Sequence, residues 1–151
     1  MAIVSDLEVR QGYILNLVRS DGQVLYDPID LTDPEPEIAV RVKAPGGAAG
    51  HTASFKYGEV YRRSRARYEI IEYTYGYWSQ AGLGSLEYHW HPLPWSRGRG
   101  VFHIHCAAGG RDRDHYRAHA MLLEEARARF RAIYGSERAV DCSGLYPLTT
   151  S

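Results

Sequence analysis

The chain has 151 residues, which suits one domain that buries about two thirds of its unfolded surface. Its formal net charge is zero, which argues against a protein that coats nucleic acid by bulk charge. No segment is long and apolar enough for a membrane span or a signal peptide, so we expect a cytoplasmic protein without membrane contact.

Signals for β-structure open the chain. Residues 12–26 predict a β-hairpin, because two apolar runs flank a Ser-Asp-Gly turn sequence at 20–22. Residues 27–37 contain three prolines and predict a loop, whereas residues 38–43 predict a strand. The glycine- and alanine-rich stretch at 44–50 is too short to separate two domains, so we expect a single domain over the whole chain.

From residue 53 onward the pattern predicts a meander of strands followed by one long helix. The strands are expected near 53–61, 66–77, 85–91 and 101–107. The helix is expected to begin at a cap on Asp112 or Asp114 and to run to about Tyr134, ending at Gly135. The expected fold class is therefore α+β, a mostly antiparallel meander sheet packed by one main C-terminal helix.

Cys106 and Cys142 are the only two cysteines, and no metal-binding spacing surrounds them. We therefore expect reduced thiols, as in a cytoplasmic protein. A disulfide between them, which would suit an extracellular protein, is the less favoured alternative.

Two His-x-His motifs, His89/His91 and His103/His105, are the most informative feature of the chain. Alternate side chains of a strand share a face, so each motif places both imidazoles on one face. A hairpin loop at 92–100 makes the strands antiparallel, and we expect His89 opposite His105 and His91 opposite His103.

The other residues of this predicted hairpin divide between the same two faces. Glu87 shares the histidine face and is expected to orient His89 or to act as a base. The other face is apolar and is expected to pack beneath the helix. Its residues are Tyr88, Trp90, Phe102 and Ile104.

Two chemistries compete for the four histidines. Paired imidazoles can act as general acid and general base on a phosphodiester without a metal, because imidazole titrates near neutral pH. Alternatively, the same four histidines can ligate zinc or another transition metal. A solvated sheet face and a buried, packed histidine network are the alternatives without a function.

His115 and His119 are secondary candidates. They lie four residues apart on the predicted helix and therefore on one helical face. Because we expect the helix to cover the apolar face of the hairpin, both would lie across the sheet from the other histidines.

Arginines are concentrated in two predicted turns that should lie at the same end of the meander. They are Arg62, Arg63, Arg65, Arg97 and Arg99. Such side chains can bind phosphate, and their coincidence with the histidines favours phosphodiester chemistry, with RNA as the expected partner. Aromatic residues flank the first turn and would either stack on bases or pack in the core. They are Tyr57, Tyr61, Tyr68, Tyr73, Tyr75, Tyr77 and Trp78.

The strand ending Glu87-Tyr-His-Trp-His91-Pro92, a variable loop, the strand Val101-Phe-His-Ile-His105 and a closing helix span about residues 67–133. This arrangement resembles the small TumE-type toxins of bacterial toxin–antitoxin pairs, although an Asp-Asn commonly stands in those toxins where this chain has His89-Trp90. The resemblance carries over His103 and His105. It implies a cytoplasmic toxin that acts on RNA and is neutralised by an antitoxin protein.

The leading prediction is therefore a small cytoplasmic, metal-independent protein of the ribonuclease type. In it, His89, His91, His103, His105 and Glu87 would be catalytic and the five turn arginines would bind phosphate. The alternatives are a histidine-ligated metal-binding protein and a non-enzymatic protein-binding module. Nothing in the pattern predicts an oligomeric state.

Overall fold

The computed structural model describes residues 3–46, 52–79, 82–108, 114–136 and 138–148. One antiparallel sheet of eight strands has the order β2-β3-β4-β5-β6-β7-β8, and β1 pairs with one end of β5. The elements are β1 (Ile3–Val4), α1 (Leu7–Val18), β2 (Gln23–Tyr26), β3 (Glu37–Ala44), β4 (Ala53–Ser64), β5 (Arg67–Ser79), β6 (Gly84–Pro92), β7 (Gly100–Ala108), β8 (Asp114–Arg117) and α2 (Leu123–Ser136).

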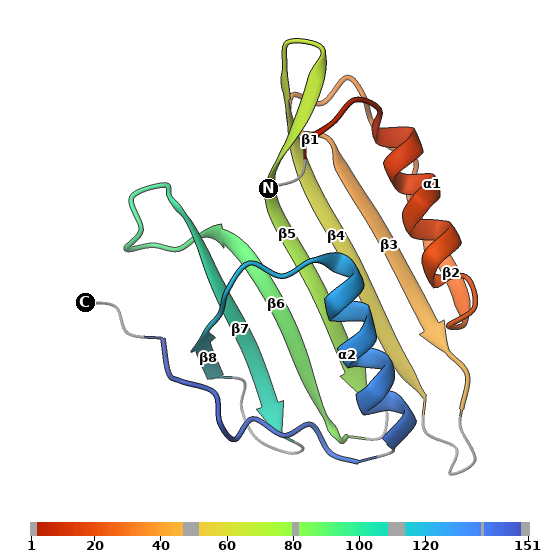
Figure 1. The fold of residues 1–151 in the computed structure, drawn as a ribbon, viewed down its shortest axis with the longest axis vertical. Helices are drawn as coiled ribbons and strands as arrows, with labels where there is room; N and C mark the ends of the chain where they lie inside the picture. Colours follow the sequence, from red (N-terminus) through yellow and green to blue (C-terminus); the bar gives the residue numbers. More distant parts are fainter. Residues whose placement is uncertain (1–2, 47–51, 80–81, 109–113, 137, 149–151) are drawn as a thin grey trace.

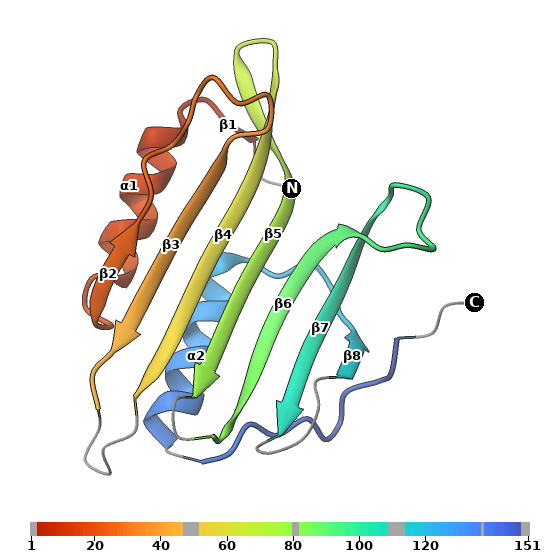
Figure 2. The ribbon, with the colours of Figure 1, turned by 180° about the vertical axis from the view of Figure 1, so that it is seen from behind.

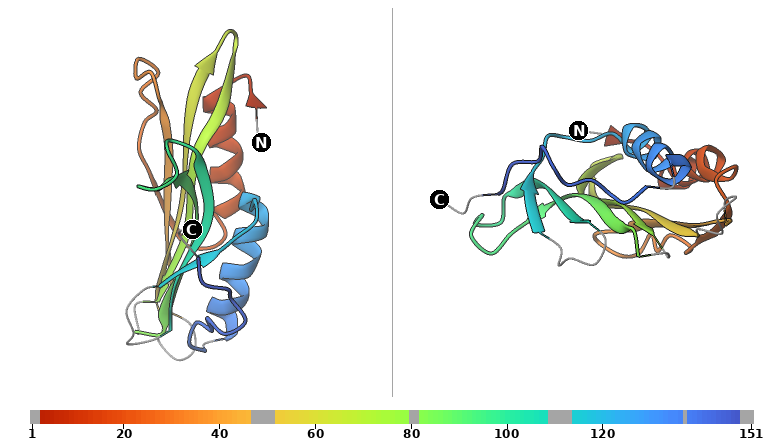
Figure 3. Two further views of the ribbon diagram at one scale, coloured as in Figure 1. Left: turned by 90° about the vertical axis from the view of Figure 1, so that its left-hand side faces the viewer. Right: turned by 90° about the horizontal axis from the view of Figure 1, so that it is seen from below.

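The two helices lie side by side on one face of the sheet (Figures 1 and 3). Helix α1 packs against β3, and α2 packs against β4 and β5. The opposite face, which we call the open face, carries no helix of the described chain (Figure 2). The α+β meander and the packing of a C-terminal helix on it are confirmed.

The core lies between the helices and the sheet. Phe130 of α2 is completely buried, and its ring contacts those of Phe55, Tyr57, Tyr77 and Tyr88 from three strands. Tyr88, on the predicted apolar face of the histidine hairpin, therefore packs against α2 as expected. The histidines, which alternate with these residues, consequently point to the open face.

The predicted hairpin at 12–26 is wrong, because residues 7–18 form α1. Asp6 caps this helix, and its carboxylate accepts hydrogen bonds from the backbone N–H groups of Glu8 and Val9. The buried positions, Leu7, Gln11, Ile14 and Val18, recur with the helical period. The nearly continuous apolar run at 13–18 gave the misleading strand signal.

The start of the C-terminal helix is also wrong. Helix α2 begins at Leu123, whereas residues 114–117 form β8, the edge strand that pairs with β7. The expected cap at Asp114 therefore opens a strand, and the alternative cap at Asp112 lies outside the described residues. Tertiary pairing with β7 decides the conformation of this short segment, which a local pattern cannot reveal.

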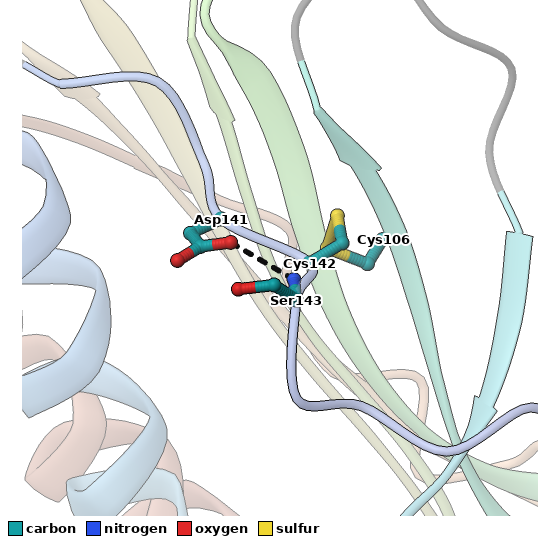
Figure 4. The surroundings of a disulfide bond; sticks show 4 residues. All are labelled: Cys106, Asp141, Cys142 and Ser143. Carbon is teal, nitrogen blue, oxygen red and sulfur yellow. Dashed lines mark hydrogen bonds between the residues drawn. A yellow bond between two sulfur atoms is a disulfide. The ribbon is translucent and has the colours of Figure 1, made fainter.

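Cys106 and Cys142 form a disulfide (Figure 4), so the expectation of reduced thiols is wrong. The bond joins β7 to the segment 138–148, whose Pro147 also bridges to Tyr116 of β8. This segment therefore covers the outer edge of β8 and is tied to the sheet at two points. No described helix is long and apolar enough to cross a membrane.

Candidate functional site

Five histidines from three adjacent strands gather on the open face. This histidine cluster consists of His89 and His91 on β6, His103 and His105 on β7, and His115 on β8. The centre of the His89 imidazole lies 5.2 Å from that of His103 and 4.2 Å from that of His105. The His105 and His115 rings are 4.1 Å apart.

The register of the hairpin differs from the predicted one by two residues. His89 lies opposite His103, Glu87 opposite His105, and His91 opposite Val101. The turn is centred on Ser96, whose hydroxyl accepts from the N–H of Leu93 and donates to its carbonyl. A shift of two residues keeps every side chain on its face, so the histidines still converge although the predicted pairs do not form.

Burial separates the histidines of β7 from those of the neighbouring strands. His103 is 0% exposed and His105 is 8% exposed, whereas His115 lies at the surface. Burial disfavours the charged imidazolium and lowers the pKa of His103 to about 4 and that of His105 to about 3. Both rings are therefore neutral at neutral pH, the form in which histidine binds metals.

Three ring nitrogens on β7 have no hydrogen-bond partner within the described chain. His103 donates from Nδ1 to the carbonyl of Val101 at 2.9 Å, so the Nε2 of the neutral ring is unprotonated and carries a lone pair. This Nε2 and both ring nitrogens of His105 are buried without a partner. A buried polar atom left unsatisfied costs about 1–3 kcal/mol, so the arrangement calls for an explanation.

On β6, Glu87 and the two histidines form a chain of polar contacts. His91 donates from Nδ1 to the carbonyl of Pro92 at 2.8 Å, so the Nε2 of a neutral His91 is an acceptor. His89 contacts this Nε2 through its Nδ1 and an oxygen of Glu87 through its Nε2, both at 3.1 Å. A neutral His89 has one proton for two acceptors, so both contacts are satisfied only when a second proton or a metal ion lies in one of them.

Three of the histidines are close enough to share a metal ion. One ring nitrogen from each of His89, His103 and His105 lies within 4.8 Å of the other two. His91, at 3.1 Å from the Nδ1 of His89, lies at the margin of this group. The structure thus brings together five of the predicted site residues, the four histidines and Glu87, which is 4% exposed.

His115 belongs to the histidine cluster, contrary to expectation, because it lies on β8 directly opposite His105. Sequence analysis placed it on a helix and so missed it. His119 lies in the exposed segment before α2, and no ring contact links it to the histidine cluster within the described chain.

The two turns that carry these arginines lie at one end of the sheet but are separate from each other (Figure 1). Arg62 pairs with Glu35 at 2.8 Å. Arg65 lines one hollow with its own turn, and Arg97 and Arg99 line another with Trp95. The structure therefore does not join the two turns into one phosphate-binding rim.

The tyrosines of β4 and β5 are core residues. Those at positions 57, 61, 73, 75 and 77 are at most 4% exposed and face the helices. They are therefore not available for stacking on bases, and Tyr68 is only partly exposed. Trp78 alternates with them and reaches the open face.

Comparisons with protein-family models, curated proteins and solved structures find no match to this chain. The histidine cluster is therefore interpreted from its own geometry, and the resemblance to TumE-type toxins stays a prediction.

Proposed function

We propose that this protein binds a transition-metal ion, with Zn²⁺ the best fit, through His89, His103 and His105. The observation that carries the proposal is the set of buried ring nitrogens without partners on β7, close to a third imidazole. Zinc and related ions take neutral imidazole nitrogen as a preferred ligand. A bound ion would supply the partner that these nitrogens lack.

The hydrogen bonds around the cluster suit this role. Metal-binding histidines usually donate their second ring N–H to a carboxylate or a backbone carbonyl, which fixes the ring and raises its basicity. His103 has such an anchor in the Val101 carbonyl, and His89 has one in Glu87. With the His89 proton on Nε2, its Nδ1 keeps a lone pair that a metal ion can bind.

The spacing requires the rings to move closer together. A Zn–N bond is about 2.1 Å long and the usual geometry is tetrahedral, so two nitrogens on one ion are about 3.4 Å apart. The nitrogens of the three histidines lie within 4.8 Å of one another, so side-chain rotation would have to close a difference of up to about 1.4 Å. His91 is the candidate fourth ligand, because its Nε2 already lies 3.1 Å from the Nδ1 of His89.

The test is a titration of tag-free, chelator-stripped protein with Zn²⁺ in a calorimeter, checked by elemental analysis. We expect one ion per chain. His103→Leu and His105→Leu should each abolish the binding, while the matched control His119→Leu should bind as the wild type does. Circular dichroism identifies variants that remain folded. Substoichiometric binding by the wild type, or equal binding by folded variants, would contradict the proposal.

The metal-independent cleavage of RNA stays a prediction that this proposal competes with. Neutral His103 and His105 cannot donate a proton as imidazolium at neutral pH, which gives less support to acid–base catalysis by these two rings. Incubation of the protein with RNA, with and without chelator, separates the two chemistries. An antitoxin partner and a cytoplasmic location also stay predictions, and the disulfide is more typical of an oxidising compartment.

A further inference from the structure

A second feature of the open face lies over β2 to β5, away from the histidine cluster. It is a surface hollow of about 380 Å³, a size within the usual range for small-ligand pockets. Its lining includes Leu25, Arg41, Lys43, Ser54, Lys56 and Trp78.

The hollow is strongly basic on a neutral protein. It contains both lysines of the chain, and Arg41 lies directly opposite Lys56 in the pairing of β3 with β4. Like charges directly opposite each other on neighbouring strands destabilise a sheet. Their occurrence here favours an anionic ligand that offsets the repulsion.

Carboxylates neutralise this charge only weakly. The Oδ1 of Asp27 lies 4.0 Å from a guanidinium nitrogen of Arg41, and both side chains are more than half exposed. Glu37 reaches toward Gly58, over which the stem of Lys56 also lies. Within the described chain, neither Lys43 nor Lys56 has a carboxylate oxygen within ion-pair distance.

Trp78 adds a planar aromatic wall to the basic hollow. Its six-membered ring lies over Gly76 so closely that a Cβ at that position would collide with it. The missing side chain of Gly76 therefore allows the partly exposed indole to fold down onto the sheet beside the lysines. An indole in such a position can stack on a flat, aromatic ligand.

We propose that this hollow, the basic–Trp78 site, binds a free nucleotide. Arg41, Lys43 and Lys56 would bind the phosphate through charge-assisted hydrogen bonds, and Trp78 would stack on the base. The site is independent of metal binding. The site nevertheless lies on the same face as the histidine cluster. The two sites are three strands apart, because the successive partners across the sheet are Lys56, Gly76, Glu87 and His105. At the usual strand spacing, Lys56 and His105 are about 14 Å apart.

The test is calorimetric titration with adenosine monophosphate in the presence of EDTA, so that a metal cannot act as the binding group. We expect saturable binding of one nucleotide per chain, with Kd below about 1 mM. Adenosine and inorganic phosphate should each bind at least about tenfold more weakly, because each makes half of the contacts. Failure of the nucleotide to bind, or equal binding of all three compounds, would overturn the proposal.

Variants locate the site. Lys43→Gln and Lys56→Gln should each weaken nucleotide binding about tenfold, because each removes one charge-assisted hydrogen bond. Trp78→Leu should weaken nucleotide binding by a similar factor and leave phosphate binding unchanged. The matched control Arg19→Gln, at an exposed position at the end of α1, should bind as the wild type does.

A loss of binding in Arg63→Gln with wild-type binding in Lys56→Gln would place the nucleotide at the arginine turn and overturn the assignment. A six-residue single-stranded RNA tests the source of the nucleotide. Tighter binding of this RNA than of the mononucleotide, lost in the same variants, would overturn the assignment to a free nucleotide. A negative zinc titration would leave these results unaffected.

Discussion

Glu59 on the helix-covered face and His105 on the open face are both buried, but their surroundings differ. Both carboxylate oxygens of Glu59 accept hydrogen bonds from Arg10, and one also accepts from Tyr61 and the other from Tyr75. Both ring nitrogens of His105 lack a partner within the described chain. One cluster is completed by the protein, and the other has the form of a site that an added ligand completes.

The two clusters also differ in how they treat charge. Burial alone would raise the pKa of Glu59, but the hydrogen bonds and the charge of Arg10 outweigh it and lower that pKa below its ordinary value. Around His105 burial is the largest cause, and the pKa falls to about 3. Glu59 therefore keeps its charge in the interior, whereas the imidazole of His105 is neutral. A buried charge with all its partners is structural, and a buried neutral imidazole without partners is suited to a metal.

The largest effect on stability is expected from breaking the hydrogen-bonded cluster around Glu59. Arg10→Met leaves the carboxylate of Glu59 buried without its cation and should lower the free energy of unfolding by about 3–5 kcal/mol. Urea denaturation measures this loss, and the exposed Arg19→Met is the control. Zinc affinity of the folded fraction should not change, because the clusters lie on opposite faces. A loss of zinc binding would show that the two clusters are coupled.

The disulfide is expected to stabilise the fold at the sheet edge beside the histidine cluster. Cys106 and Cys142 are 36 residues apart, so the loss of this cross-link in Cys142→Ser should lower the free energy of unfolding by about 4 kcal/mol. Denaturation with and without reductant measures the effect, with Ser143→Ala as the control. Zinc stoichiometry should stay at one ion, because His89, His103 and His105 lie on β6 and β7. A variant as stable as the oxidised wild type would show that the cross-link contributes nothing.

Acid should lower the free energy of unfolding by protonating Glu59. A carboxyl with a lowered pKa in the folded state contributes stability that is present above its unfolded pKa, about 4.3, and is lost as the pH falls through its folded pKa. Stability should therefore fall below about pH 4.3. Urea midpoints measured across this range should depend less on pH in Glu59→Gln. Equal dependence would assign the acid sensitivity to other groups.

Glu87 tests the open-face cluster without touching a proposed metal ligand. Glu87→Gln keeps the shape of the side chain but removes the charge that strengthens the N–H donation of His89, so zinc affinity should fall about tenfold. Competition with a chelator of known affinity measures the change, and the exposed Glu69→Gln is the control. Unchanged affinity would mean that Glu87 does not position His89 for the metal.

The meander and the faces of its strands were predictable because alternation along a strand is a local property. His89, His91, His103 and His105 were placed on one face by this rule alone, and the rule holds even though the register is shifted by two residues. The register itself depends on the turn around Ser96, whose hydroxyl bonds to Leu93 are not visible in a hydrophobic pattern.

What the sequence could not reveal depends on contacts between distant segments. His115 joins the histidine cluster only because β8 pairs with β7, and Cys106 meets Cys142 only because the C-terminal segment follows that edge. The neutrality of the whole chain likewise gave no sign that Arg41, Lys43 and Lys56 lie together, because sheet pairing assembles them from two strands.

The smallest expected effect is that of His105→Leu on the free energy of unfolding. It tests the difference between Glu59 and His105 most directly, because its sign should be opposite to that of Arg10→Met. In metal-free protein, His105→Leu replaces a buried ring that has two unsatisfied nitrogens with an apolar side chain. It should therefore leave the free energy of unfolding unchanged or raise it by about 1 kcal/mol, where Arg10→Met lowers it. Added zinc should then stabilise the wild type, by about 2.7 kcal/mol at a hundred times Kd, and should not stabilise the variant. The exposed His115→Leu is the control for a histidine change on the same face. If His105→Leu instead destabilises the metal-free protein as much as Arg10→Met does, His105 is already satisfied in its fold. The distinction between a completed cluster and one that awaits a ligand would then fail.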